Sequence, residues 1–313
     1  MTSTRISEDC QHGKTAVIEM AAASGLNRVP EERRNALAAS TTGTGELIRE
    51  ALESGYRKII IGLGDSATSD GGTGMARVLG IKFLDKYNQP IPGGGGGLRQ
   101  LEYIDNSERH PLIKESNIAC ACDVTNPLYG PEGAAYVYGP QKGASPEDIK
   151  KLDAGLRRLA DIIRRDIGED ISQLPGGGAA GGLAAGLVAF LDASLQSGVD
   201  IICESIGFEK HLEGADLVIT GEGRIDSQTA RGKTICGIAS RAKKSGVPVI
   251  AIVGELGEGY RTVFDCGISQ AIGIMSEGID REYAIKNAAQ LVKNAVTNIL
   301  RKHPGGNTVN VSG

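Results

Sequence analysis

The sequence predicts an α/β protein with two α/β domains and a cleft between them, and three features carry this prediction. Short apolar runs at residues 59–61 and 249–253 are typical of strands in a parallel sheet that is buried on both faces. Stretches in which apolar residues recur at helical spacing alternate with these runs. The 45 glycines of the 313-residue chain lie in discrete loops, which favours an enzyme with ligand-facing turns over a disordered protein.

The composition argues against several classes of partner. The formal net charge is -4, Trp is absent and Phe occurs only 4 times, so a nucleic-acid surface is not expected. Glycines interrupt the longest apolar stretch well short of a membrane span, and no signal peptide precedes it, so we expect a cytoplasmic protein without membrane contact. The six cysteines show neither a C-x-x-C pair nor the spacing of a disulfide framework. The four histidines show no metal-ligand spacing.

The loop at residues 62–72 follows the apolar run 59–61 and leads to a helix near residue 74. Its glycines let backbone N–H groups approach an anion, and the dipole of the following helix favours negative charge there. The loop lacks the Gly-Lys-Ser/Thr of a P-loop, so a tight turn that needs glycine for steric reasons is the alternative interpretation. The residues expected to line a bound phosphate are Gly64, Ser66, Thr68, Asp70, Gly71 and Gly72.

Two further predicted strands lead to a carboxylate. Asp123 ends a second buried strand at residues 116–123, and Asp226 lies in the loop 221–229 that follows the strand 216–220. In open parallel sheets, ligands bind at the carboxyl ends of the strands. Converging carboxylates without histidine or cysteine suit a metal–phosphate site and a base for a hydroxyl group. A turn cap for Asp123 and a helix N-cap for Asp226 are the structural alternatives.

Other segments have simpler predictions. Residues 133–142 are predicted to form a short strand and a loop, and the five glycines at 93–97 a plain surface connection. Ser145 is predicted to cap a helix that runs to about residue 167, and Thr44 to cap a helix that ends near residue 54. In residues 175–191, small side chains permit either the close approach of a ligand or close packing against another element.

Seven stretches together resemble the glycerate kinase family, which makes phosphoglycerate from glycerate and ATP. Each stretch is a weak signal alone, but they occur in the family's order and span nearly the whole chain. They are KTAVIEMAAASGL from Lys14, TGELI from Thr44, IGLGDSATSDGGTGM from Ile61, CDVTNPLYGPEGA from Cys122, GPQKGA from Gly139, PGGGAAGGLAAGL from Pro175 and TGEGRIDSQTARGKT from Thr220.

The resemblance implies a glycerate kinase, an enzyme that transfers a phosphoryl group from ATP to D-glycerate with the help of Mg²⁺. It favours the 2-phospho product, although the motifs do not identify the hydroxyl group. Glycerate and ATP are the implied partners, and a homodimer is compatible with the resemblance.

The resemblance also implies roles for individual residues. Asp226 and Asp123 would act as the base or as Mg²⁺ ligands, and Arg224 and Lys142 would neutralise a phosphate or the glycerate carboxylate. A surface position is the alternative for Lys233. The implied nucleotide contacts beyond loop 62–72 are Gly221, Glu222 and Lys233.

The chain departs from the family pattern in two ways. It enters the pattern near Lys14, whereas family members carry a further N-terminal segment. A truncated, non-catalytic ligand-binding or assembly subunit is therefore the alternative function. In addition, Asp65 and Ser69 stand where the family usually has glycine and asparagine. The carboxylate of Asp65 would repel a phosphate unless it points away or joins the shell of a metal ion.

These patterns predict two domains of different architecture. A smaller mixed α/β domain would comprise residues 1–43 and 81–200. A Rossmann-like domain with a parallel three-layer sheet would comprise residues 44–80 and 201–313.

Overall fold

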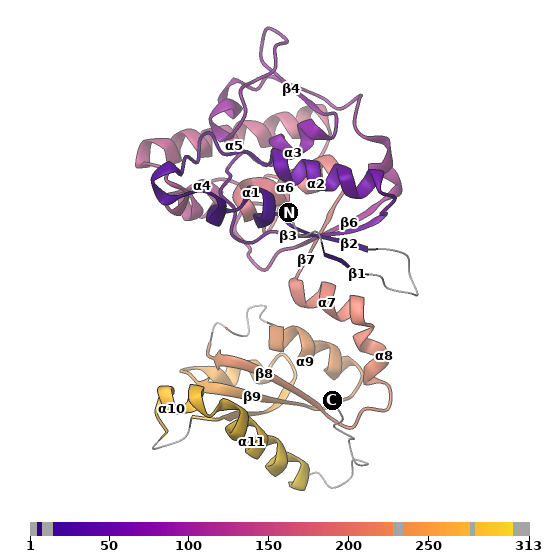
Figure 1. The fold of residues 1–313 in the computed structure, drawn as a ribbon, viewed down its shortest axis with the longest axis vertical. Coiled ribbons are helices and arrows are strands. Elements are labelled where there is room, and N and C mark those ends of the chain that lie inside the picture. Colours follow the sequence, from indigo (N-terminus) through magenta and orange to yellow (C-terminus); the bar gives the residue numbers. More distant parts are fainter. Residues whose placement is uncertain (1–4, 8–14, 228, 230–233, 276–278, 303–313) are drawn as a thin grey trace. The chain divides into compact units, whose positions relative to one another are not determined.

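The structure is a computed structural model and describes residues 5–7, 15–227, 229, 234–275 and 279–302. The chain forms two compact units, Met1–Ser197 and Gly198–Gly313, and each has its own sheet and core (Figure 1). The prediction of an α/β protein with two domains is confirmed. The mixed unit, which we predicted to be the smaller one, is the larger of the two.

A five-stranded sheet in the order β1-β2-β3-β6-β7 forms the centre of the first unit. The last four strands pair in parallel, whereas β1 is antiparallel to β2. Ile59 and Ile61 are buried and Ile60 on the opposite face is only half-buried, so burial on both faces is less complete than predicted. The strands are β1 (Arg5–Ser7), β2 (Thr15–Glu19), β3 (Lys58–Gly62), β6 (Asn117–Ala121) and β7 (Ser194–Gln196).

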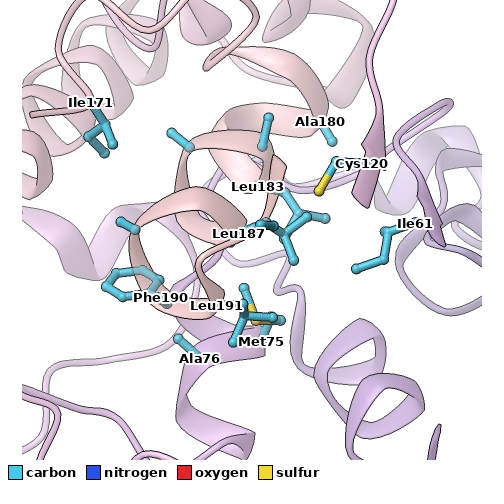
Figure 2. Close-up of a cluster of buried hydrophobic side chains, with 14 of the residues drawn as sticks. Ile61, Met75, Ala76, Cys120, Ile171, Ala180, Leu183, Leu187, Phe190 and Leu191 are labelled. Atoms are coloured by element: carbon cyan, nitrogen blue, oxygen red, sulfur yellow. The ribbon is translucent and has the colours of Figure 1, made fainter. Parts of the chain in front are cut away.

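Helix α6 (Leu183–Leu191) lies at the centre of the first unit's core. Figure 2 shows Leu183 and Leu187 of this helix beside Cys120 and Ile61 of the sheet. The ring of Phe190 meets the ring of Phe83 edge-on, with the centroids 5.3 Å apart. The other elements are α1 (Ala21–Ser24), α2 (Thr42–Glu53), α3 (Thr73–Val78), α4 (Ala134–Tyr138), α5 (Pro146–Asp166) and the strand pair β4 (Lys82–Leu84) and β5 (Tyr103–Asp105).

Two helix starts test the predicted caps. The Ser145 hydroxyl accepts a hydrogen bond from the Asp148 N–H, and the Asp148 carboxylate accepts one from the Ser145 N–H, both at 3.2 Å. This capping box confirms the predicted start of α5. Thr44, in contrast, lies inside the first turn of α2, whose N-cap is Thr41, and its hydroxyl is 2.9 Å from the Ser24 hydroxyl. The predicted cap at Thr44 is therefore wrong.

Two segments differ from their predicted conformation. Residues 133–142 form α4 and a 3-10 turn, η5 (Pro140–Lys142), instead of a strand; the Gly139 N–H donates to the Ala135 carbonyl at 3.0 Å and continues the helical turn. The glycines at 93–97 run into a second 3-10 turn, η3 (Gly95–Gln100), and do not form a plain surface connection. An added Cβ at Gly95 would lie 2.4 Å from the Ser69 carbonyl oxygen, so this glycine permits close packing.

The second unit contains a parallel sheet in the order β10-β9-β8. Ile235 of α9 packs on one face of the sheet and Ile299 of α11 on the other, so the predicted Rossmann-like three-layer arrangement is confirmed. Two helices, α10 and α11, end the described part of this unit. The elements are α7 (Gly198–Ile206), α8 (Phe208–Leu212), β8 (Val218–Ile225), α9 (Thr234–Lys244), β9 (Val249–Leu256), β10 (Ile268–Gly273), α10 (Arg281–Lys286) and α11 (Ala288–Lys302).

The domain boundaries differ from those predicted. Residues 44–80 were assigned to the same domain as 201–313, but β3 lies between β2 and β6 in the first unit's sheet. Five consecutive residue pairs join β3 to each of these neighbours. Residues 44–80 therefore belong to the first unit, since backbone hydrogen bonds on both sides of a central strand fix its sheet.

Two expectations drawn from composition can be compared with the structure. Cys236 and Cys266 form a disulfide with their Cα atoms 5.4 Å apart, although 30 residues separate them in sequence. The sequence did not predict this pair, because packing within the second unit brings the two residues together.

Among the described helices, none has both the length and the apolar composition needed to cross a bilayer.

The packing of α6 predicts a large effect of truncating one of its buried side chains. Leu187→Ala should lower the free energy of unfolding by about 2–5 kcal/mol, since it leaves a cavity between the helix and the sheet. Val137→Ala, at a position that is 45% exposed, should change it by less than about 1 kcal/mol. Urea unfolding followed by circular dichroism measures both, and equal effects would contradict the central place of α6.

Candidate active site

The loop after β3 packs tightly against the start of α6. The Gly71 N–H donates to the Gly181 carbonyl at 3.1 Å, and the Gly72 N–H donates to Asp70 Oδ1 at 3.1 Å. An added Cβ at Gly181 would lie 1.9 Å from the Thr68 carbonyl oxygen. Close packing is therefore what the small residues of 175–191 provide here. The N–H groups of Gly71 and Gly72, which we expected to face a phosphate, donate within the protein.

The carboxylate of Asp70 is completely buried and joins three segments. It accepts hydrogen bonds from the Thr41 N–H at 2.9 Å and from the Thr41 hydroxyl. It also accepts bonds from the Ser40 hydroxyl at 3.3 Å and from the Gly74 N–H at 3.2 Å. With the Gly72 N–H, five donors surround the two oxygens. This predicted ligand contact thus holds the starts of α2 and α3 to the loop after β3.

Lys142 lies beneath the same loop and is 1% exposed. Its Nζ donates to Ser66 Oγ at 2.8 Å and to the Thr68 carbonyl oxygen at 2.6 Å. Burial lowers the pKa of Lys142 to about 7, and the charge of Asp70 opposes this effect. Three predicted site residues therefore lie together in the first unit. Nearby, Thr68 Oγ1 and Ser69 Oγ are buried and have no hydrogen-bond partner among the described residues.

A cavity of about 250 Å³ opens onto Lys142. Arg33 and Arg34 form part of its wall, and none of the described residues that line it is Asp or Glu. Arg34 Nη1 donates to the Gln141 carbonyl at 3.3 Å, whereas its Nε is buried without a partner among the described residues. Neither arginine belongs to the site predicted from the sequence, where the Arg-Arg-Asn run at 33–35 is the local signal.

Gly64, Asp65 and Asp123 are exposed positions near the carboxyl ends of β3 and β6. Asp65 has a φ of 53°, a conformation that glycine adopts freely and that aspartate tolerates better than most residues. The Asp65 carbonyl accepts a hydrogen bond from the Leu26 N–H at 2.7 Å. The geometry at position 65 thus explains why a glycine suits it.

Arg224 and Asp226 lie together at the carboxyl end of β8 in the second unit. Arg224 Nε is 3.7 Å from Asp226 Oδ2, and Arg224 Nη1 is 3.4 Å from Glu255 Oε1 on β9. The Thr229 hydroxyl accepts a hydrogen bond from the Asp226 N–H at 3.0 Å. Two carboxylates thus lie beside one guanidinium, which balances part of their negative charge.

A pocket of about 730 Å³ lies between the second unit's sheet and α10–α11. Gly221 and Glu222 line it, but as part of β8, because this strand continues to Ile225 where we predicted a loop. Most of its wall is apolar, and Arg224, Glu255 and Arg281 add charge. Lys233 lies outside the described residues.

The predicted site residues form two groups, one in each unit. Lys142, Ser66 and Thr68 lie together in the first unit, and Arg224 and Asp226 in the second. Within the described residues, no group of three or more His, Cys, Asp or Glu side chains could by itself hold a metal ion. A metal site built from Asp123 and Asp226 stays a prediction.

The buried carboxylate predicts that Asp70→Asn lowers the free energy of unfolding by about 2–4 kcal/mol. The amide supplies N–H donors where the protein already presents donors, so buried hydrogen bonds are lost. Asp161→Asn on α5, where the carboxylate side chain is 61% exposed, is the matched control and should cost less than about 0.5 kcal/mol. Urea titration of both variants tests this, and a similar stability of the two would refute it.

Comparisons with known proteins agree on one family. The model of the Glycerate kinase family matches residues 3–303. A protein named glycerate kinase from Halalkalibacterium halodurans is 50% identical over 286 residues, which are 91% of this chain and 75% of that protein. A glycerate 2-kinase from Escherichia coli is 47% identical over 287 residues, which are 92% of this chain and 75% of that protein.

A solved structure shares the fold. The crystal structure assigned to a glycerate kinase 2 of Salmonella typhimurium LT2 has a TM-score of 0.79 and 46% sequence identity. The match covers 95% of this chain and 77% of that chain. The α/β architecture, the order of the motifs and the family match over residues 3–303 lead to one conclusion: the chain belongs to the glycerate kinase family.

Proposed function

We propose that the protein is a glycerate kinase, which transfers the γ-phosphoryl group of ATP to D-glycerate. The family match over residues 3–303 carries this proposal, and it does not favour the non-catalytic alternative. The E. coli relative is named a glycerate 2-kinase, which supports the 2-hydroxyl group as the acceptor. The consumption of ATP supports a cytoplasmic location.

The reaction needs an acceptor oxygen, a base and groups that neutralise charge. The hydroxyl oxygen of glycerate forms a bond to the γ-phosphorus, the bond from this phosphorus to the β–γ bridging oxygen breaks, and ADP leaves. Asp226 is the proposed base that receives the hydroxyl proton. Arg224 is the proposed group that stabilises negative charge on the phosphoryl group, and its position beside Asp226 supports this role.

The 730 Å³ pocket of the second unit is our proposed nucleotide site. Its volume falls within the range of sites for nucleotide-sized ligands. Ile219 and Ile252 supply apolar wall for a base, and Arg224 and Arg281 supply positive charge for phosphates. Gly221 and Glu222, which we predicted as nucleotide contacts, line the same pocket.

Asp123 and Asp226 are each a proposed ligand of Mg²⁺, and for Asp226 this role is the alternative to its role as the base. Carboxylate oxygens are the ligands that this ion prefers, which supports an aspartate at each of these positions. When bound, Mg²⁺ would neutralise the charge that develops on the phosphates.

An ATP-consumption assay with D-glycerate and Mg²⁺ tests the proposed activity. The chain should turn over, and Asp226→Asn should lower kcat at least about 100-fold, since it removes the base. Asp265→Asn, at an exposed position of the same unit, should keep kcat within about twofold. Phosphorus NMR of the product should show the 2-phospho isomer. A chain that consumes no ATP with D-glycerate contradicts the proposal.

We also propose that the protein is a homodimer. Helix α7 exposes Ile202 and Ile206, which are 60% and 56% exposed, and adjacent apolar side chains of this kind support a subunit contact. Light scattering from the purified chain should give about twice the mass of 32.6 kDa, and a mass near that of one chain would contradict a dimer.

A further inference from the structure

The 250 Å³ cavity of the first unit has the charge of an anion site. Arg33, Arg34 and Lys142 contribute three cationic side chains to its lining, and no carboxylate balances them there. Asp70 is the acidic group that acts on Lys142, but five donors within the protein already surround its oxygens. An anionic ligand would supply the missing negative charge.

Two of these cations keep donors that the described protein does not use. The ammonium of Lys142 has three N–H donors, of which Ser66 and Thr68 take two. Arg34 donates from Nη1 to a backbone carbonyl, while its buried Nε has no partner. The third N–H of the Lys142 ammonium is therefore available to an acceptor on a ligand, and the terminal Nη groups of Arg34 are the part of this guanidinium that a ligand can reach, because its Nε is shielded.

The size and walls of the cavity indicate which anion. A volume of about 250 Å³ lies below the usual range for drug-sized ligands, so the cavity suits a small acid better than a nucleotide. Leu26, Val29 and Ala67 form an apolar wall beside the charges. A short carbon chain with one carboxylate contacts both kinds of wall, whereas a free phosphate leaves the apolar wall bare.

We propose that this cavity binds the carboxylate of glycerate and that Arg34 is a specificity-determining residue that selects acids over neutral alcohols. The inference rests on the proposed glycerate kinase function. A guanidinium pairs with a carboxylate through two parallel hydrogen bonds, and the two Nη groups of Arg34 can form this fork. Lys142, which lines the same cavity, adds a second positive charge.

The site also predicts how acid binding depends on pH. The charged or titratable groups that surround Lys142 are Arg33 and Arg34 from the segment before α2, and Asp70 from the loop after β3. Burial lowers the pKa of Lys142 to about 7 in the free protein, so the ammonium loses its proton above this pH. A bound carboxylate favours the protonated form. The Kd for D-glycerate should therefore rise with pH above about 7, by up to tenfold per pH unit.

Calorimetric titration of the full chain with D-glycerate, without ATP, tests the proposal independently of turnover. Arg34→Gln should raise the Kd for D-glycerate at least about tenfold and leave the KM for ATP within about twofold. Arg28→Gln, at an exposed position outside the cavity lining, is the matched control and should bind like the unaltered chain. The same Kd for Arg34→Gln and the unaltered chain overturns the proposal. The proposal is also overturned if Arg34→Gln loses the binding of ADP or inorganic phosphate but still binds D-glycerate, because the cavity would then bind a phosphate.

The pH dependence gives a second readout. Arg34→Gln should keep the rise of Kd between pH 7 and about 9, because Lys142 is intact, whereas Lys142→Met should bind weakly at all pH values in a folded protein. A Kd for the unaltered chain that is constant over this range overturns the role of Lys142. If circular dichroism shows that Lys142→Met is unfolded, the change of Kd with pH, measured for Arg34→Gln and for the unaltered chain, still tests the role of Lys142.

The result also separates this inference from the proposed function. Binding of D-glycerate that depends on Arg34, without ATP consumption, supports the acid site and refutes the kinase activity. Turnover with an unchanged KM for D-glycerate in Arg34→Gln overturns the acid site and leaves the kinase activity intact. A chain that neither binds nor phosphorylates D-glycerate overturns both.

Discussion

The geometry of the first unit depends on the buried carboxylate of Asp70. Five donors from residues 40–41 and from the start of α3 surround it, and they hold α2, α3 and the loop after β3 in one arrangement. A buried charge is tolerated in such a place only when its oxygens are fully hydrogen-bonded. The same loop covers Lys142. Asp70, which holds the loop in place, therefore contributes to the burial of the Lys142 side chain.

Glycines allow the loop after β3 to pack closely, because they have no side chain. The backbone of residues 68–72 lies directly against residues 181–186, and a Cβ at Gly186 would lie 2.4 Å from the Gly71 carbonyl oxygen. With Gly71 and Gly72 used for packing, the polar chemistry of the loop falls to Ser66, Thr68 and the lysine below them. Arg33, Arg34 and Lys142 line a small cavity, and none of the described residues in its lining is acidic. This excess of positive charge favours the binding of an acid in the proposed site.

The second unit carries charges of both signs at its candidate site. Asp226 and Glu255 lie beside one arginine at the carboxyl ends of β8 and β9, next to a larger pocket with apolar walls. Phosphoryl transfer to an alcohol depends mainly on positioning and charge neutralisation, and each unit by itself offers groups suited to one of these tasks.

The sequence by itself determined the α/β class, the two-domain organisation, the capping box of α5 and the family, because these depend on local periodicity, cap chemistry and ordered motifs. The tertiary structure decided what spacing does not encode: β3 belongs to the first unit's sheet, Cys236 pairs with Cys266, and Gly71 and Gly72 pack instead of facing solvent. Arg34 is the clearest example for the site. Its place beside Lys142, 108 positions later in the chain, depends on long-range packing, which a local pattern does not report.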